Sequence, residues 1–172
     1  MKKRLNTLEV ALDNEMRERE FYLKNAGRTS NHLGKAMFQQ IAEEELEHYE
    51  RLKQLKENWE KQGKWPGTLP LTVKDTNVRD ILKEMVKKAS NMEAGDDDTL
   101  KAIQTAIAFE AEGAIFYARL RDEVSDPKEK AFFNLLADIE HEHFVSLKDT
   151  EEFLTDPASW YRKRESTSLD GD

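Results

Sequence analysis

Two pairs of candidate metal ligands occur in the sequence, each a glutamate followed three residues later by a histidine. They are Glu45 with His48 and Glu140 with His143. Residues three apart on an α-helix lie on the same face, so a carboxylate and an imidazole with this spacing can point at one metal ion. One such pair is weak evidence, because glutamate-rich helices are usually just solvated. The chemistry to consider is therefore metal binding, provided that the two pairs belong to one site.

Both pairs belong to an internal repeat. A shift of 95 residues places residues 5–55 on residues 100–150 without a gap, and 15 of the 51 aligned pairs are identical. The identical positions include a glutamate, Glu15 or Glu110, that precedes each Glu-x-x-His pair by 30 residues, and a Phe-Tyr dipeptide. Two unrelated helices would not usually share these three features at one offset. We interpret the repeat as one structural unit that occurs twice.

Each repeat has the pattern of a helical hairpin. The predicted helices span about residues 3–26, 31–62, 98–123 and 127–154. Ser30 or Asn31 is the expected N-cap of the second helix. Asp126 is the expected N-cap of the fourth, with Pro127 at its first position and Glu129 placed for a capping box.

Residues 63–97 connect the two hairpins. Residues 63–76 contain two prolines and two glycines, which predicts a loop, and apolar residues at helical spacing over 77–90 predict a short crossover helix. Ferritin-like folds join two hairpins by a long crossover of this kind. We predict an all-α antiparallel four-helix bundle of this type over residues 1–155. A C-terminal tail over 156–172, without a fifth bundle helix, should pack on its surface.

Every predicted bundle helix has a glutamate in the stripe that should face the core. In the second helix, the stripe consists of Phe38, Ile41, Glu45, His48, Leu52 and Leu55. In the first helix, it consists of Leu5, Leu8, Leu12, Glu15, Arg19 and Tyr22. Steps of three and four residues are typical of a helix-packing stripe. Arg19 is unexpected there: either it pairs with Glu18 or a ligand, or the helical phase slips at this point.

Four carboxylates cannot remain ionised together in an apolar interior, because burying each unpaired charge costs several kcal/mol. They would take up protons unless cations were bound among them. Two divalent ions would neutralise four carboxylates and leave both imidazoles uncharged. The predicted two-metal site consists of Glu15, Glu45, His48, Glu110, Glu140 and His143.

This ligand set is the one used by di-iron and di-manganese carboxylate bundles. In such sites the glutamates of the Glu-x-x-His pairs, here Glu45 and Glu140, bridge the two ions. The other four ligands would be terminal, in the pairs Glu15 with His48 and Glu110 with His143. Oxygen and imidazole ligands suit iron or manganese, so we expect two iron ions, with manganese or zinc as substitutes. Tyr22 and Tyr117 are either hydrogen-bond donors to ligand carboxylates or ordinary core tyrosines.

The motif Glu15…Phe21-Tyr22…Glu45-x-x-His48 and its repeat resemble the rubrerythrin family of ferritin-like di-iron proteins, over roughly residues 3–155. The resemblance implies an oxidoreductase that reduces hydrogen peroxide, or dioxygen, with the six ligands as its catalytic groups. Full-length members end in a rubredoxin domain with Cys-x-x-Cys pairs, and this chain has no cysteine. The resemblance therefore implies an external electron-donor protein such as rubredoxin.

The chain departs from the family pattern at one further position. The family has an additional glutamate three residues after the third-helix ligand, where this chain has Gly113. Glu18 occupies the mirrored position in the first helix. We predict that Glu18 supplies the extra carboxylate from that side, near His143.

Composition limits the other functions. The net charge of −8 with no basic stripe argues against nucleic-acid binding. No apolar run approaches the roughly 18 residues of a membrane span, and we expect a cytoplasmic homodimer. The absence of cysteine excludes Cys-ligated clusters and thiol catalysis in this chain. Two alternatives remain, namely ferritin-like iron oxidation and storage and a non-catalytic metal-binding helical module.

Overall fold

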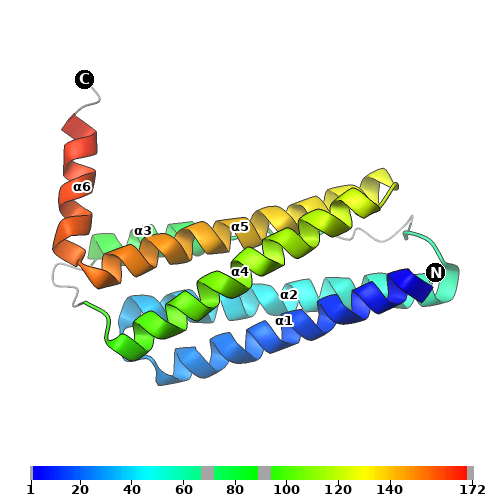
Figure 1. Ribbon diagram of the computed structural model, residues 1–172, viewed down its shortest axis with the longest axis horizontal. Helices are drawn as coiled ribbons and strands as arrows, with labels where there is room; N and C mark the ends of the chain where they lie inside the picture. The colour runs from blue at the N-terminus through cyan, green and yellow to red at the C-terminus, as the bar shows by residue number, and fades with distance from the viewer. Residues whose placement is uncertain (1, 67–71, 89–93, 170–172) are drawn as a thin grey trace.

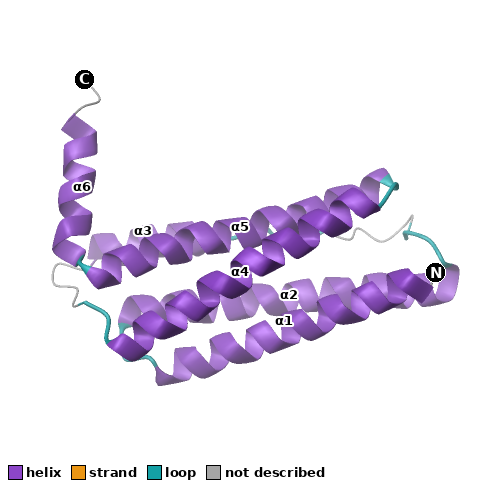
Figure 2. Ribbon diagram, viewed as in Figure 1, coloured by secondary structure: helices purple, strands orange, loops and turns teal. Residues whose placement is uncertain are grey.

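The computed structural model describes residues 2–66, 72–88 and 94–169, and all regular structure within this part of the chain is helical (Figure 2). Its helices are α1 (Lys2–Arg28), α2 (His32–Gln62), α3 (Val78–Lys88), α4 (Asp97–Glu123), α5 (Pro127–Thr155) and α6 (Pro157–Leu169). The four long helices α1, α2, α4 and α5 form the bundle (Figure 1). The predicted all-α bundle with a short helix in its crossover is confirmed. None of the described helices is long and apolar enough to cross a lipid bilayer.

The bundle is assembled from two antiparallel hairpins. Helix α1 packs along α2 and α4 packs along α5, while α1 also lies beside α4 and α2 beside α5 (Figure 1). The buried apolar residues form two clusters, and the internal repeat relates one cluster to the other. Tyr22 and Phe38 belong to the first cluster, whereas their repeat mates Tyr117 and Phe133 belong to the second.

Polar side chains cap the helices at the expected places. Asn31, not Ser30, is the N-cap of α2, and its side chain accepts a hydrogen bond from the N–H of Gly34 at 2.9 Å. Asp126 accepts hydrogen bonds from two N–H groups of the first turn of α5, at 2.9 and 3.1 Å. The predicted capping box does not form. The Glu129 carboxylate instead lies 3.1 Å from a guanidinium nitrogen of Arg4, which links α5 to the first turns of α1.

The crossover helix α3 packs across α2 and α5. Its buried residues are Val78, Leu82 and Val86. Two carboxylates of α2 hold the segment that leads into it. Glu44 Oε1 accepts a hydrogen bond from the N–H of Asn77 at 3.0 Å, and Glu47 Oε1 accepts one from the N–H of Lys74 at 3.2 Å.

The C-terminal tail differs from the prediction, because it contains helix α6. In Figure 1, α6 turns away from the bundle axis at the end of α5. Trp160 is buried, lies edge-on to Phe153 at 5.2 Å and donates its indole N–H to Asp149 at 2.9 Å. The rest of α6 is largely polar and lacks an apolar stripe, so the periodicity of the sequence did not reveal it.

Candidate metal centre

The structure brings the six predicted ligands together between the two hairpins. Each of them is buried, with no more than 1% of its surface exposed. They are Glu15 of α1, Glu45 and His48 of α2, Glu110 of α4, and Glu140 and His143 of α5. The helical stripes that the sequence suggested therefore converge at one place.

The potential ligand atoms form two overlapping groups. Within each group, one ligand atom from every residue lies within 4.8 Å of the others. The first group consists of Glu15, Glu45, His48 and Glu140, and the second of Glu45, Glu110, Glu140 and His143. Glu45 and Glu140 belong to both groups, so their carboxylates are placed to contact two ions at once.

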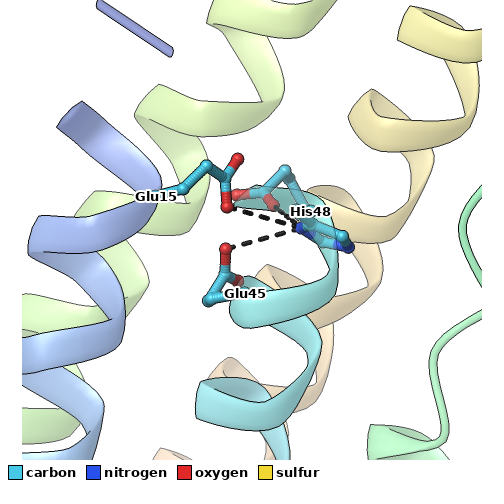
Figure 3. A group of neighbouring side chains, drawn as sticks. Glu15, Glu45 and His48 are labelled. Atoms are coloured by element: carbon cyan, nitrogen blue, oxygen red, sulfur yellow. Dashed lines mark ion pairs between the residues drawn. The ribbon is translucent and has the colours of Figure 1, made fainter. Parts of the chain in front are cut away.

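The histidine rings present their Nδ1 atoms to these carboxylates. His48 Nδ1 lies 3.5 Å from Glu15 Oε2 and 3.4 Å from Glu45 Oε2, and Figure 3 shows both carboxylates pointing at it. His143 Nδ1 lies 3.2 Å from Glu110 Oε2. The two rings are nearly parallel, with centroids 6.3 Å apart. Each imidazole therefore approaches one terminal glutamate from the neighbouring helix of its own hairpin.

Tyr22 and Tyr117 form reciprocal hydrogen bonds between the two hairpins. Tyr22 of α1 donates its hydroxyl to Glu110 of α4, and Tyr117 of α4 donates to Glu15 of α1. Both tyrosines are buried. Each bond occupies Oε1 of a terminal glutamate and leaves its Oε2 facing the cluster, which fixes the orientation of both carboxylates.

Several buried atoms of the cluster have no hydrogen-bond partner among the described residues. They are Glu15 Oε2, both carboxylate oxygens of Glu45 and of Glu140, and His48 Nδ1. Leaving a buried polar atom unsatisfied costs about 1–3 kcal/mol, and more for a charged group. Metal cations would satisfy all of these atoms together. The donors are carboxylate oxygens and imidazole nitrogens with no sulfur, so the site fits iron or manganese.

Comparison with known proteins agrees with this geometry. Residues 6–151 match the family model described as Rubrerythrin. The chain belongs to the rubrerythrin family. A solved structure of a hypothetical protein from Pyrococcus furiosus is similar, with a TM-score of 0.61 and 25% identity, covering 87% of this chain and 89% of that chain. No curated protein matches the chain. For a rubrerythrin-family protein, the buried Glu/His cluster is compatible with a di-iron site.

Without cations, the cluster holds protons instead. Burial, together with the negative charge of Glu45, raises the pKa of Glu15 to about 8. Burial and the charges of Glu45 and Glu110 also raise the pKa of Glu140 well above its usual value. Burial disfavours a charged His48, but the charge of Glu45 and the contacts of the ring with the carboxylates of Glu140 and Glu15 together outweigh this and raise the pKa of the imidazole. Binding of cations must therefore release protons.

The core-facing side of α1 differs from the predicted stripe. Ala11 and Glu18 are buried, whereas Leu12 and Arg19 are only partly buried. The phase slip suggested by Arg19 is therefore real. The small side chain of Ala11 and the carboxyl of Glu18 share the inward face with Glu15 because these residues follow one another at steps of four and three.

Glu18 lies at the edge of the cluster. It is 6% exposed, and burial with the charges of Glu45, Glu110 and Glu15 raises its pKa to about 11. It belongs to neither group of potential ligands, so its role as an extra ligand in this rubrerythrin-family protein stays a prediction. Together with Gly113 it lines a cavity of about 430 Å³ between α1 and α4.

Gly113, where the family pattern has its extra glutamate, lies directly beside the carboxylate of Glu140. A Cβ atom at this position would be 2.5 Å from Glu140 Oε2. Two non-bonded atoms cannot remain that close, so a side chain here would displace the Glu140 carboxylate. The glycine thus gives Glu140 the space that it occupies.

One residue that contacts the cluster, Glu44, was not predicted from the sequence. Glu44 Oε2 of α2 lies 2.5 Å from His143 Nε2 of α5. Burial opposes ionisation of Glu44, but its hydrogen bond to His143 and the charge of that ring lower its pKa to about 2. Glu44 stands in a run of three glutamates and falls outside the predicted stripe, and its repeat mate is Ile139. No pattern in the sequence distinguished it from its neighbours.

Proposed function

We propose that this rubrerythrin-family protein binds two iron ions and reduces hydrogen peroxide, or dioxygen, with electrons from an external donor protein such as rubredoxin. The observation that carries the proposal is the group of buried carboxylate and imidazole atoms that lack any hydrogen-bond partner. When bound, the two ferrous ions supply two electrons for cleavage of an O–O bond. Glu45 and Glu140 would hold both ions, and the remaining four ligands would hold one ion each in pairs.

A path for a small substrate supports this function. The cavity of about 430 Å³ between α1 and α4 is lined both by buried Glu15 and by exposed Arg119. It therefore lies between the surface and Glu15. Glu18 and Tyr117 also line it, so an entering molecule meets polar groups close to the ligands. Peroxide and dioxygen are small enough to use such a path.

The protein's own residues keep the ligands oriented during turnover. The hydroxyls of Tyr22 and Tyr117 bind the outer oxygens of Glu110 and Glu15, so these carboxylates cannot rotate freely. The two apolar clusters on either side exclude bulk water, which strengthens electrostatic interactions at the site. Reduction of peroxide to two waters consumes two electrons and two protons. The donor protein supplies the electrons, and the cavity admits protons from solvent.

Metal analysis and single-turnover oxidation test the proposal. We expect about two iron ions per chain, rapid oxidation of the anaerobic ferrous protein by peroxide and slower oxidation by dioxygen. The double variant Glu45→Ala/Glu140→Ala should lose the metal, since it removes both bridging carboxylates. Unchanged iron content in this variant would refute the assignment of the site. Iron binding without any peroxide turnover would instead favour a non-catalytic metal-binding module.

We also propose that the protein is a homodimer. The mass of the particle in solution distinguishes this function from iron storage. A storage protein of the ferritin type needs a closed shell of many subunits around its mineral. Light scattering of the iron-loaded protein should give the mass of two chains. A shell-sized particle that accumulates iron far beyond two ions per chain would contradict the proposed peroxidase.

A further inference from the structure

His143 is held at both of its ring nitrogens, on opposite sides of the ring. Its Nδ1 lies 3.2 Å from Glu110 Oε2, inside the cluster of potential ligands. Its Nε2 lies 2.5 Å from Glu44 Oε2, on the side away from the cluster. Glu44 and His143 are 99 residues apart in sequence, and their contact joins α2 to α5 across the two hairpins.

Glu44 is itself fixed in place by two donors. Its other oxygen, Oε1, accepts a hydrogen bond from the side chain of Gln40 at 2.8 Å and one from the N–H of Asn77 at 3.0 Å. One carboxylate thus ties α2, the segment leading into α3, and α5 to one another. A carboxylate held at both oxygens is a rigid support for the imidazole.

The contact determines which nitrogen of His143 can bind a metal ion. An ionised carboxylate only accepts hydrogen bonds, so the proton shared with Glu44 lies on Nε2 of the ring. In the neutral ring, Nδ1 then carries the free lone pair and faces the cluster. Histidines that bind metals commonly donate their other N–H to a carboxylate, which fixes the ring and makes it a better ligand.

The two halves of the cluster differ in this respect. The 95-residue repeat aligns Glu44 with Ile139, a buried hydrocarbon side chain. The carboxylates near His48 belong to Glu15, Glu45 and Glu140, and all of them approach its Nδ1. Within the described residues, His143 has a carboxylate behind its ring and His48 does not.

We propose that Glu44 is a positioning residue that fixes His143 with Nδ1 free for metal, and that it makes the His143 half of the site the tighter-binding half. The inference rests on the proposed metal site and adds to it the order in which the two metal ions bind. Loss of the outer carboxylate of a metal-binding histidine typically weakens metal affinity by roughly 10- to 100-fold. Here the affinity should fall for the ion held by His143 and stay unchanged for the ion held by His48.

Cobalt titration of the metal-free full chain tests this order. We expect the wild type to bind two Co²⁺ ions per chain in two steps of unequal affinity. Calorimetry and the visible absorption of bound cobalt measure both steps. Glu44→Ala should weaken the tighter step by roughly 10- to 100-fold and leave the weaker step unchanged. Glu44→Gln should restore part of the loss, because the amide oxygen still accepts the Nε2 proton.

Glu47→Ala is the matched control. Glu47 lies on the same helix, is also partly buried, and accepts a hydrogen bond from the same crossover segment at 3.2 Å, but its carboxylate forms no hydrogen bond or ion pair with either histidine ring. We expect both cobalt steps to be unchanged in this variant. Equal losses in Glu44→Ala and Glu47→Ala would overturn the inference, because attachment of the crossover would then explain both.

The remaining outcomes separate this inference from the proposed function. Two equal cobalt sites that are unaffected by Glu44→Ala would overturn the role of Glu44 and leave the metal site intact. A wild-type chain that binds no cobalt would overturn both. If Glu44→Ala fails to fold, the Gln variant decides, since a tighter step identical to that of the wild type would contradict a role for the carboxylate charge.

Discussion

The hydroxyls of Tyr22 and Tyr117 connect the two hairpins at the cluster by hydrogen bonds. Each is buried and donates to a glutamate of the facing hairpin. A buried carboxylate oxygen that loses its donor is left unsatisfied, which is more costly than the hydrogen bond itself is worth. The two tyrosines therefore affect both the stability of the bundle and the orientation of its terminal ligands.

Tyr22→Phe should lower the free energy of unfolding by about 1–3 kcal/mol, because Glu110 Oε1 loses its donor in a buried place. Urea denaturation of the metal-free protein measures this change. Tyr117→Phe should have a similar effect through Glu15. Tyr161→Phe is the comparison: it removes a hydroxyl that donates to the Val86 carbonyl at 3.0 Å, but Tyr161 is 37% exposed, so water can replace the lost bond and the loss of stability should be smaller. An equal loss there would argue against a special role for the buried pair.

Gly113→Ala should weaken metal binding while the protein stays folded. The added Cβ would lie 2.5 Å from Glu140 Oε2, so that carboxylate must move away from the place where it would hold the metal ions. The atom that must move is at the end of a flexible side chain, so circular dichroism should be unchanged while the cobalt titration shifts to weaker binding.

Gly27→Ala is the matched control for Gly113→Ala, because a Cβ at position 27 would meet no atom within 4 Å. It should leave metal binding unchanged and slightly stabilise α1 through the better helix propensity of alanine. Equal metal affinity in both glycine variants would show that the space beside Glu140 has no role in binding.

The starts of α2, α4 and α5 are each fixed by a local side-chain cap. Asp126 satisfies two N–H groups that the first turn of α5 would otherwise leave without partners. This contact lies at the end of the bundle, far along α5 from Glu140 and His143. Its energetic role can therefore be separated from that of the metal ligands.

Asp126→Ala should lower the free energy of unfolding by about 1 kcal/mol, the usual loss for an N-cap. Chemical denaturation monitored by circular dichroism measures it. Asp126→Asn should retain most of the stability, since asparagine is an equally good cap. Metal stoichiometry should be unchanged in both variants; a loss of metal would mean that the start of α5 positions the ligands.

The bundle as a whole is a scaffold whose six candidate ligands come from four helices. The unfolded chain cannot assemble this set, so a bound metal favours the folded state. By linkage, a ligand at a free concentration of 100 times its Kd stabilises the folded state by about 2.7 kcal/mol.

Metal should therefore raise the Tm of the wild-type protein, and a chelator should lower it again. Differential scanning calorimetry with and without Mn²⁺ or Co²⁺ measures the shift. The Glu45→Ala/Glu140→Ala double variant should show no metal-dependent shift. A shift of equal size in that variant would place the bound metal elsewhere on the molecule.

Features that depend on interactions between near neighbours in the chain could be predicted from the amino-acid sequence. The helix pattern, the cap at Asp126 and the Glu-x-x-His spacing all follow from interactions between residues fewer than about five apart. The internal repeat then predicted that Glu15 and Glu110 belong with those pairs. These residues lie together in the structure, because core-facing stripes of a bundle converge wherever the helices pack.

Contacts between distant segments became visible only in the folded protein. The bonds Tyr22–Glu110 and Tyr117–Glu15 join residues 88 and 102 apart, and Glu44 meets His143 across 99 residues. Whether α1 buries Glu18 or Arg19 depends on a small rotation of the helix, and helical periodicity does not resolve a rotation by one residue. Such contacts are fixed by the packing of the hairpins against one another, which no local pattern encodes.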